Sequence, residues 1–237
     1  QLCFEQINSW LNETPNEEIK YLRQLQGIDD QDPVVIRNLG DKYFELNQYE
    51  KAKPEYEKAL LIWERLGAKP NWWTYDRLGI IYHKNGWYRK EKKLYDKGAK
   101  NFPYNLSIIQ RQAILELTKG DTVTANEYIE KHISLRKTNK ASDGVITTSL
   151  ADIYSDAGLL DRAEDYYRKA LSLSPENFGR MNTLAYFLID KNRNINEGLQ
   201  LADTALKSRP DDYNYLHTKG WGLYKQRKYE EALELLQ

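Results

Sequence analysis

Cysteine is almost absent from this sequence, because Cys3 is the only one in 237 residues. No disulfide can form within the chain, which fits a reducing compartment without identifying one. One thiol cannot build a thiolate metal site, and His83, His132 and His217 are scattered and read as ordinary surface or groove residues. No glycine-rich phosphate loop occurs either. We therefore predict no catalytic, cofactor or metal site, and a protein that is not an enzyme.

Long apolar runs and an excess of one charge are missing as well. No stretch of the chain approaches the about 18 apolar residues that a membrane helix needs, so we expect no direct membrane insertion. Lys plus Arg equals Asp plus Glu at 35 each, whereas proteins that bind nucleic acid usually carry a basic excess. We therefore expect no nucleic-acid partner. A hydrophobic content of 41% with 30% charged residues suits a globular protein rich in helix.

What the sequence does contain is a repeat of about 34 residues. The stretches 37–62, 76–103 and 149–175 share one pattern: Leu and a small residue, Tyr three positions later, a turn, and a second segment with small residues seven apart. Numbering each repeat from position 1 places the starts at Pro33, Trp72, Leu106, Gly144, Phe178 and Tyr213. A period of this length predicts stacked helical units rather than one closed core.

Small residues recur at fixed positions of this repeat. Position 8 is small in all six repeats, as Gly40, Gly79, Ala113, Ala151, Ala185 and Gly220. Position 20 is small in five of six, the exception being Glu91. Small side chains on the facing sides of two helices let their backbones approach closely, while neighbouring Leu and Tyr side chains fill the space around them. Proline at position 32 of three repeats ends the second helix.

The pattern resembles the tetratricopeptide repeat over residues 33–237. The resemblance implies an all-α fold, a right-handed superhelical solenoid of antiparallel helix pairs with roughly twelve to fourteen helices. Residues 1–32 are expected to form divergent N-terminal helices that pack on the solenoid. The third repeat departs from the pattern, because Gln112, Glu116 and His132 replace Leu, Tyr and a small residue.

Both ends of the sequence read as boundaries within a longer protein. The chain starts at Gln1 and stops inside a predicted helix, so we expect the solenoid to be truncated and any targeting segment to lie outside it. Leu233 and Leu236 then lack the helix that would normally cover them. We expect self-association through this C-terminal end, because exposed apolar rows favour association.

The resemblance also implies a concave groove lined by the first helix of each pair, with repeat positions 2, 5, 9, 12 and 13 facing it. The predicted partner-binding residues are Arg37, Asp41, Phe44, Trp73, Asp76, His83, Gln110, Asp152, Asn182, Tyr186, His217, Trp221, Tyr224 and Lys225. Trp73, Tyr186, Trp221 and Tyr224 are candidate anchors, because aromatic side chains dominate binding hot spots. The alternative is that some of them pack against the next repeat.

The family's known clamp for a C-terminal carboxylate needs Lys and Asn at positions 5 and 9 of one repeat. Arg37 with Asp41, or Asp76 with Ile80, does not fit it. We therefore predict a non-enzymatic scaffold that binds a protein or peptide by other contacts. The alternative is a peptide- or ligand-sensing regulatory domain whose effector domain lies outside this sequence.

Overall fold

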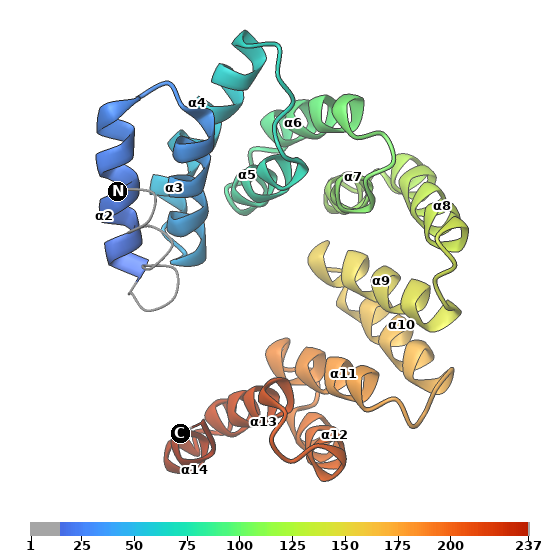
Figure 1. Ribbon diagram of the computed structural model, residues 1–237. Helices are drawn as coiled ribbons and strands as arrows, with labels where there is room; N and C mark the ends of the chain where they lie inside the picture. The colour runs from blue at the N-terminus through green and yellow to red at the C-terminus, as the bar shows by residue number, and fades with distance from the viewer. Residues whose placement is uncertain (1–14, 237) are drawn as a thin grey trace. The chain divides into compact units, whose positions relative to one another are not determined.

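The computed structural model describes residues 15–236, and side chains within 17–235. Every regular element in this range is an α-helix, 13 in all (Figure 1). The helices are α2 (Pro15–Ile28), α3 (Pro33–Glu45), α4 (Tyr49–Arg65), α5 (Trp72–Lys84), α6 (Tyr88–Asn101), α7 (Leu106–Thr118), α8 (Thr122–Thr138), α9 (Asp143–Asp156), α10 (Leu160–Ser172), α11 (Phe178–Asp190), α12 (Ile195–Ser208), α13 (Tyr213–Lys225) and α14 (Tyr229–Leu236). The expected helical structure before residue 15 lies outside the described residues, as does the side chain of Leu236.

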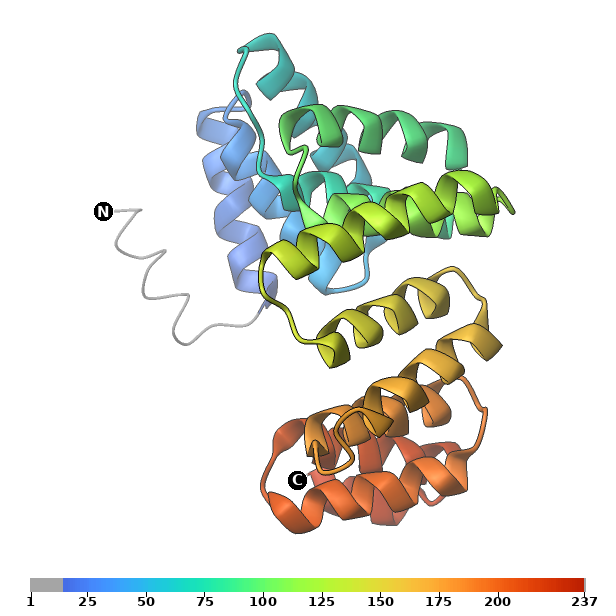
Figure 2. The ribbon, with the colours of Figure 1, turned by 90° about the vertical axis from the view of Figure 1, so that its right-hand side faces the viewer.

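Successive helices pack as antiparallel pairs joined by short turns, which confirms the predicted all-α architecture (Figure 1, Figure 2). The closely packed pairs are α3 with α4, α5 with α6, α9 with α10, α11 with α12, and α13 with α14. No described helix has both the length and the apolar character needed to cross a lipid bilayer.

The chain divides into two compact units, one ending at Leu115 and the other beginning at Glu116. We call them unit 1 and unit 2. The division falls inside α7, in the repeat that departs most from the pattern. Its three unusual side chains, Gln112, Glu116 and His132, are all buried. His132, expected at the surface or in the groove, instead lies within unit 2, where its Nε2 is 3.1 Å from the Ser149 hydroxyl.

A left-handed residue follows the first helix of every pair. These residues are Asn47, Gly86, Gly120, Gly158, Asn192 and Arg227, with φ between 52° and 81°. Each occupies position 15 of its repeat. Glycine and asparagine adopt this conformation most easily, so five of the six turns carry residues suited to it. Because a left-handed residue recurs at position 15, repeats with different sequences make the same sharp turn between their paired helices.

At repeat positions 8 and 20, side-chain or backbone atoms of the paired helix lie very close to the Cα of the small residue. A Cβ added to Gly40 would lie 3.0 Å from the Tyr56 ring, and one on Gly79 would collide with the buried Tyr95 side chain. A Cβ on Gly198 would lie 2.6 Å from Ile189. The repeat pattern therefore reflects contact between paired helices, because nothing larger than these residues fits without displacing a buried neighbour.

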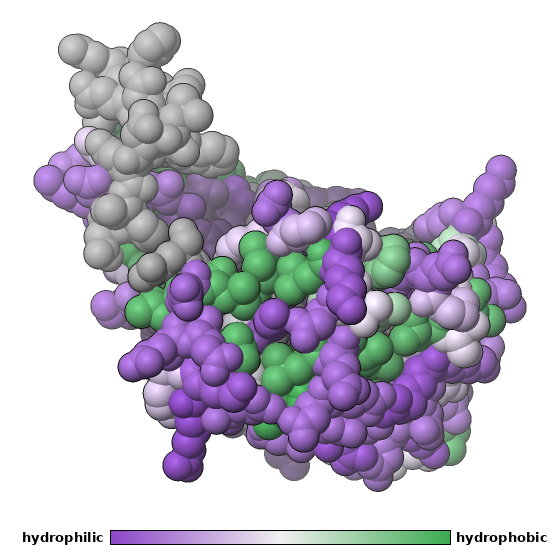
Figure 3. Space-filling view, turned by 90° about the horizontal axis from the view of Figure 1, so that it is seen from below, coloured by the Kyte–Doolittle hydropathy of each residue, from purple (hydrophilic) through white to green (hydrophobic). Residues whose placement is uncertain are grey.

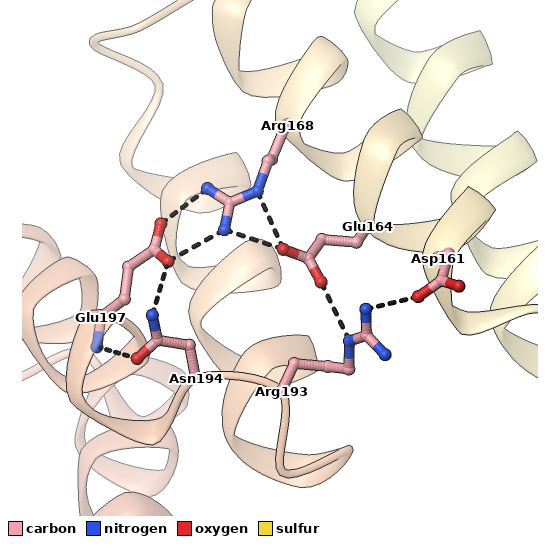
Figure 4. Close-up of polar contacts among 6 residues, drawn as sticks. All are labelled: Asp161, Glu164, Arg168, Arg193, Asn194 and Glu197. Atoms are coloured by element: carbon pink, nitrogen blue, oxygen red, sulfur yellow. Dashed lines mark hydrogen bonds and ion pairs between the residues drawn. The ribbon is translucent and has the colours of Figure 1, made fainter.

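An ion-pair network joins the second helices of two successive pairs in unit 2 (Figure 4). Arg168 of α10 makes paired contacts with Glu164, at 2.9 and 3.0 Å, and with Glu197 of α12, at 2.6 and 2.9 Å. Arg193 extends the network to Glu164 at 3.0 Å and Asp161 at 2.5 Å. The hydrogen bond from Arg168 lowers the pKa of the Glu197 carboxyl.

Candidate functional site

The first helices of unit 1 carry a closed polar cluster around Asp41. Its carboxylate accepts a hydrogen bond from the Tyr56 hydroxyl at 2.7 Å, and it pairs with Arg77 at 2.8 Å and Arg37 at 3.3 Å. Arg37 and Asp41 were both predicted to face a partner. Their charges are compensated within the unit, so Asp41 serves first to hold α3, α4 and α5 together.

Two predicted groove residues of unit 1, the candidate anchor Trp73 and Phe44, lie under guanidinium groups. The Arg37 guanidinium carbon is 5.3 Å from the centre of the Trp73 ring, and that of Arg77 is 5.4 Å from the Phe44 ring. Both rings are half-buried. Arginine over an aromatic ring is a favourable arrangement, but it covers the ring face that a partner would otherwise contact.

Two more predicted residues of unit 1, Asp76 and His83, also have partners within it. Asp76 pairs with Arg111 at 2.8 Å. The His83 ring nitrogen Nδ1 donates to the buried carboxylate of Glu91 at 3.0 Å, which explains how a charged residue is accommodated at repeat position 20. Gln110 is half-buried on α7. The polar groups on this part of the face thus link neighbouring helices.

Unit 2 presents an aromatic row along α13. Tyr213, His217, Trp221 and Tyr224 follow one another at intervals of four, four and three residues, which places them on one side of the helix. The Trp221 and Tyr224 rings are stacked, 5.3 Å apart and 8° from parallel, and the Tyr213 and His217 rings are 6.2 Å apart. We call these four residues the aromatic row.

Two tyrosines from neighbouring helices extend the aromatic row. The Tyr186 ring of α11 lies 6.3 Å from His217, and the Tyr229 ring of α14 lies 5.3 Å from Tyr224. The exposed fractions are 74% for Tyr213, 51% for Tyr224, 55% for Tyr229 and 40% for Tyr186. The structure thus brings together the predicted anchors Tyr186, Trp221 and Tyr224 with His217, and it leaves most of these rings accessible.

Polar groups border the aromatic row. The Lys225 ammonium lies 4.9 Å from the centre of the Trp221 ring and donates to the backbone carbonyl of Asp190 at 3.3 Å. Two buried polar atoms, Asn182 Oδ1 and Trp221 Nε1, have no hydrogen-bond partner among the described residues. Buried polar atoms without a partner are uncommon in native proteins, and here both belong to predicted groove residues.

Asp152 of α9 is a predicted groove residue that also contacts the second helix of its pair. It accepts a hydrogen bond from the Tyr167 hydroxyl at 2.6 Å. Burial raises the pKa of this carboxyl, and the nearby Asp156 charge acts in the same direction, although the Tyr167 hydrogen bond and Arg136 oppose them. Like Asp41, this residue connects the two helices of its own pair.

Sequence reasoning missed two contributors to the aromatic row, Tyr213 and Tyr229. Tyr213 occupies repeat position 1 and Tyr229 lies at the start of a second helix, and neither is among the positions expected to face a groove. The four-residue spacing of Tyr213, His217 and Trp221 was the available signal. Arg77 was missed as well, because position 6 gives no indication that its side chain reaches Asp41 and Phe44.

The surface near the last helices is apolar in part. Figure 3 views the molecule from the side of α12 and α14, which lie at the bottom of Figure 1, and shows hydrophobic side chains gathered among hydrophilic ones. Leu233 of α14 is exposed. Self-association through this end stays a prediction.

The described residues provide neither a cluster of metal ligands nor, among the predicted groove residues, an acid without a partner. They contain no group of three His, Cys, Asp or Glu side chains that could hold a metal ion. The acids on the predicted face, Asp41, Asp76 and Asp152, are each engaged with a neighbouring Arg or Tyr side chain. The groups left accessible are mainly aromatic ring faces, which suit contacts with apolar side chains.

A model of the family described as "Tetratricopeptide repeat" matches residues 38–62 and 148–177. No curated protein sequence matches the chain. Among solved structures, a tetratricopeptide repeat protein from Parabacteroides merdae is 14% identical, with a TM-score of 0.61 over 99% of this chain and 96% of that one. The yeast Tom70 structure is 16% identical, with a TM-score of 0.52 over 97% of this chain and 47% of that one.

A chain in the structure of the APC/C hetero-tetramer Cut9–Hcn1 is also similar, at 15% identity and a TM-score of 0.52. The match covers 88% of this chain and 40% of that one. This chain therefore spans less than half the length of the chains matched in the Cut9–Hcn1 and Tom70 structures. At these identities the likeness extends to the fold alone.

Proposed function

This chain is a member of the tetratricopeptide repeat family, and we propose that it is a non-enzymatic scaffold module that binds a protein or peptide on the first helices of its pairs. The observation that carries the proposal is the exposed aromatic row of unit 2. Rigid aromatic side chains offer a large contact area at low entropic cost, and they dominate binding hot spots.

The spacing of the aromatic row favours a peptide with repeated apolar side chains. Rings at intervals of one helical turn recur about every 5 to 6 Å along α13. A helical peptide with apolar residues three or four apart matches this interval, and so does an extended peptide with apolar residues at every second position. Lys225 and Asp190 at the border supply polar groups that would fix the peptide's orientation.

We propose that unit 1 contributes less than unit 2 to the affinity for the partner. Its candidate anchor Trp73 and the neighbouring groove residue Phe44 are covered by Arg37 and Arg77, so a partner would have to displace a guanidinium group to reach the covered face of either ring. The binding energy of the partner is therefore expected to come mainly from α11, α13 and the start of α14.

The test is selection of binding peptides from a random dodecamer display library on the purified chain, followed by fluorescence anisotropy. Tyr224→Ala and Trp221→Ala should each weaken binding by about tenfold or more, since truncating a central aromatic residue typically costs about 2 kcal/mol. Tyr104→Ala is the control, because Tyr104 is an exposed tyrosine in a turn of unit 1, outside the aromatic row.

Thermal melting separates lost binding from lost folding. Trp221 is half-buried, so the more exposed Tyr224 and Tyr186 provide variants that should leave the melting curve unchanged. Trp73→Ala tests unit 1 independently and is expected to have a smaller effect. Peptides that bind Tyr224→Ala and Tyr186→Ala as tightly as the parent would rule out the aromatic row as the binding surface.

A further inference from the structure

Six cations lie where the second helices of unit 1 begin. They are Lys51 and Lys53 of α4, Lys84 at the end of α5, and Arg89, Lys90 and Lys93 of α6. The ion pairs of unit 1 use other cations, such as Lys42, Arg77 and Lys97. None of the six forms an ion pair among the described residues. We call them the cationic turn surface.

Aromatic rings hold four of these lysines in place. The Lys53 and Lys90 ammonium groups lie 4.6 and 5.1 Å from the centre of the Trp87 ring. Lys84 lies 5.3 Å from the Tyr49 ring, and Lys51 lies 5.6 Å from the Tyr43 ring. A ring attracts an ammonium group through its quadrupole without neutralising its charge. These lysines are therefore positioned by the fold and still fully charged.

Few carboxylates are available to compensate these cations. Glu57 accepts a hydrogen bond from the Tyr82 hydroxyl at 2.7 Å, Glu91 is buried beside His83, and Glu45 pairs with Lys42. The exposed acids nearby are Glu50 and Asp96. The six cations therefore outnumber the four nearby carboxylates, Glu50, Glu57, Glu91 and Asp96, in a chain whose acidic and basic residues balance at 35 each. The surface carries a local positive field that the net charge conceals.

The helix starts add to this field. Both α4 and α6 begin here, after Gln48 and Trp87, and neither capping residue makes a side-chain hydrogen bond to its helix. The first amide groups of each helix thus point their positive ends toward the same surface. Two pairs elsewhere in the chain begin their second helices with the capping side chains of Asp121 and Asn194, whereas α10 begins after Leu159 without a side-chain cap, like α4 and α6.

We propose that the cationic turn surface docks an acidic segment of a partner protein, a short run rich in Asp and Glu. Five of the six cations are lysines, point charges on flexible stems that adapt to carboxylates at irregular spacing. The cationic turn surface belongs to unit 1, whereas the aromatic row belongs to unit 2. It therefore extends the proposed scaffold function with a second kind of ligand.

The same geometry disfavours other anionic partners. Single-stranded nucleic acid binds largely by stacking bases on open aromatic faces, but here Trp87 and Tyr49 already have ammonium groups over their rings. Binding at a membrane surface is strengthened by apolar side chains that insert among the lipids, in addition to the attraction between cations and anionic lipids. The large exposed hydrophobic residues of unit 1, which are Ile28, Val34, Leu61, Leu66 and Tyr104, do not belong to this surface.

The test uses a fluorescein-labelled decapeptide of alternating Glu and Asp as the probe, with a Gln and Asn decapeptide as its uncharged counterpart. The parent chain should bind the acidic probe at low salt, more weakly as salt rises, and should ignore the uncharged one. The double variant Lys53→Gln/Lys90→Gln should weaken binding by about tenfold or more. The control is Lys131→Gln/Lys137→Gln in α8, which removes the same charge from two exposed lysines and should change the affinity less than twofold.

Circular dichroism melting of both double variants checks that the helices remain folded. Three results would overturn the proposal: no binding of the acidic probe, equal loss of binding in the two double variants, or tighter binding of a decauridylate or of phosphatidylserine vesicles than of the acidic peptide. The first result would show that these cations are simply solvated and bind no acidic peptide. The second would show that they act only through the net charge of the chain. The third would assign the surface to nucleic acid or to a membrane.

Discussion

The hydroxyl of Tyr167 donates a hydrogen bond to Oδ1 of Asp152 across 2.6 Å, joining position 24 of one repeat to position 9. The same bond recurs in the first repeat, where Tyr56 donates to Asp41 across 2.7 Å. The surroundings differ. Asp41 pairs with Arg37 and Arg77, whereas Asp152 has no cation in ion-pair range among the described residues. The same Tyr–Asp hydrogen bond therefore occurs once beside two arginines and once without a paired cation.

Asp152→Asn is expected to stabilise unit 2 at neutral pH. Burial raises the pKa of the Asp152 carboxyl in the folded state above the unfolded value of about 3.9. Its contribution to stability is therefore greatest below the unfolded pKa and is lost as pH rises through the folded pKa. An amide keeps an acceptor for Tyr167 without the charge, so urea unfolding at pH 7 should show a gain of about 0.5–1 kcal/mol.

The same substitution at Asp41 should have the opposite sign. Asn at position 41 would leave Arg37 and Arg77 without their carboxylate, so the free energy of unfolding should fall by about 1–3 kcal/mol at pH 7. The gain from Asp152→Asn should also shrink as the pH is lowered toward 4. Equal effects of the two substitutions at pH 7 would contradict this account of their surroundings.

Ala163→Leu should destabilise the fold by about 1–3 kcal/mol through overpacking. Ala163 is fully buried at repeat position 20, where the paired helices α9 and α10 approach each other. Ala157→Leu should cost less, because Ala157 caps the end of α9 and is half-buried. Chemical denaturation that ranked the two variants in the reverse order would show that the repeat register is misplaced.

Arg227→Gly is expected to stabilise the turn between α13 and α14 by about 0.5–1 kcal/mol. Arg227 has φ of 64°, in the region where the Cβ of an ordinary residue is strained and glycine is not. Gln226 provides the control, because its φ of −80° is unstrained; glycine there adds unfolded-state entropy and removes the hydrogen bond that the Gln226 side chain donates to Asn196 at 2.7 Å. Thermal melting should therefore rise for Arg227→Gly and fall for Gln226→Gly, and a fall in both would argue against backbone strain at position 227.

Much of the fold could be predicted because its determinants are local or periodic. The first helices of five pairs begin at Pro33, Trp72, Leu106, Phe178 and Tyr213, where the repeat numbering starts. The fourth begins at Asp143, one residue before Gly144, because Ser142 caps it by accepting a hydrogen bond from the Val145 amide. Helix starts and caps depend on residues that lie within a few positions of one another, so they can be predicted from local sequence.

The candidate site could be predicted only in part, because side-chain direction decides it. Repeat positions located Tyr186, Trp221 and Tyr224, but they did not show that Arg37 covers Trp73 or that Asp41 is held by Arg77. Long cationic side chains reach across to neighbouring helices, and their choice between an aromatic ring and a carboxylate depends on distances the sequence does not contain. The cationic turn surface escaped notice for the same reason.

Arg168→Ala should lower the free energy of unfolding of unit 2 by about 1 kcal/mol at neutral pH, the scale of a partly exposed ion-pair network. Arg168 bridges Glu164 of its own helix and Glu197 of α12, so its loss leaves two carboxylates facing each other across the helices. Lys169→Ala is the matched control. Lys169 is the next residue, is exposed, and forms no ion pair among the described residues, so its removal should change stability little.

The loss of unfolding free energy in Arg168→Ala should depend on pH, and this dependence tests whether the charge of Arg168 causes it. The Arg168 hydrogen bond lowers the pKa of Glu197 in the folded state, so the stabilisation is present above the unfolded pKa of about 4.3 and is lost as pH falls through the folded pKa. Urea unfolding of the parent and Arg168→Ala should therefore differ at pH 7 and converge as the pH approaches 3. Added salt at pH 7 should narrow the difference as well, because the network is partly exposed. A deficit that persisted unchanged at low pH would mean that Arg168 stabilises unit 2 by packing its aliphatic stem rather than by its charge.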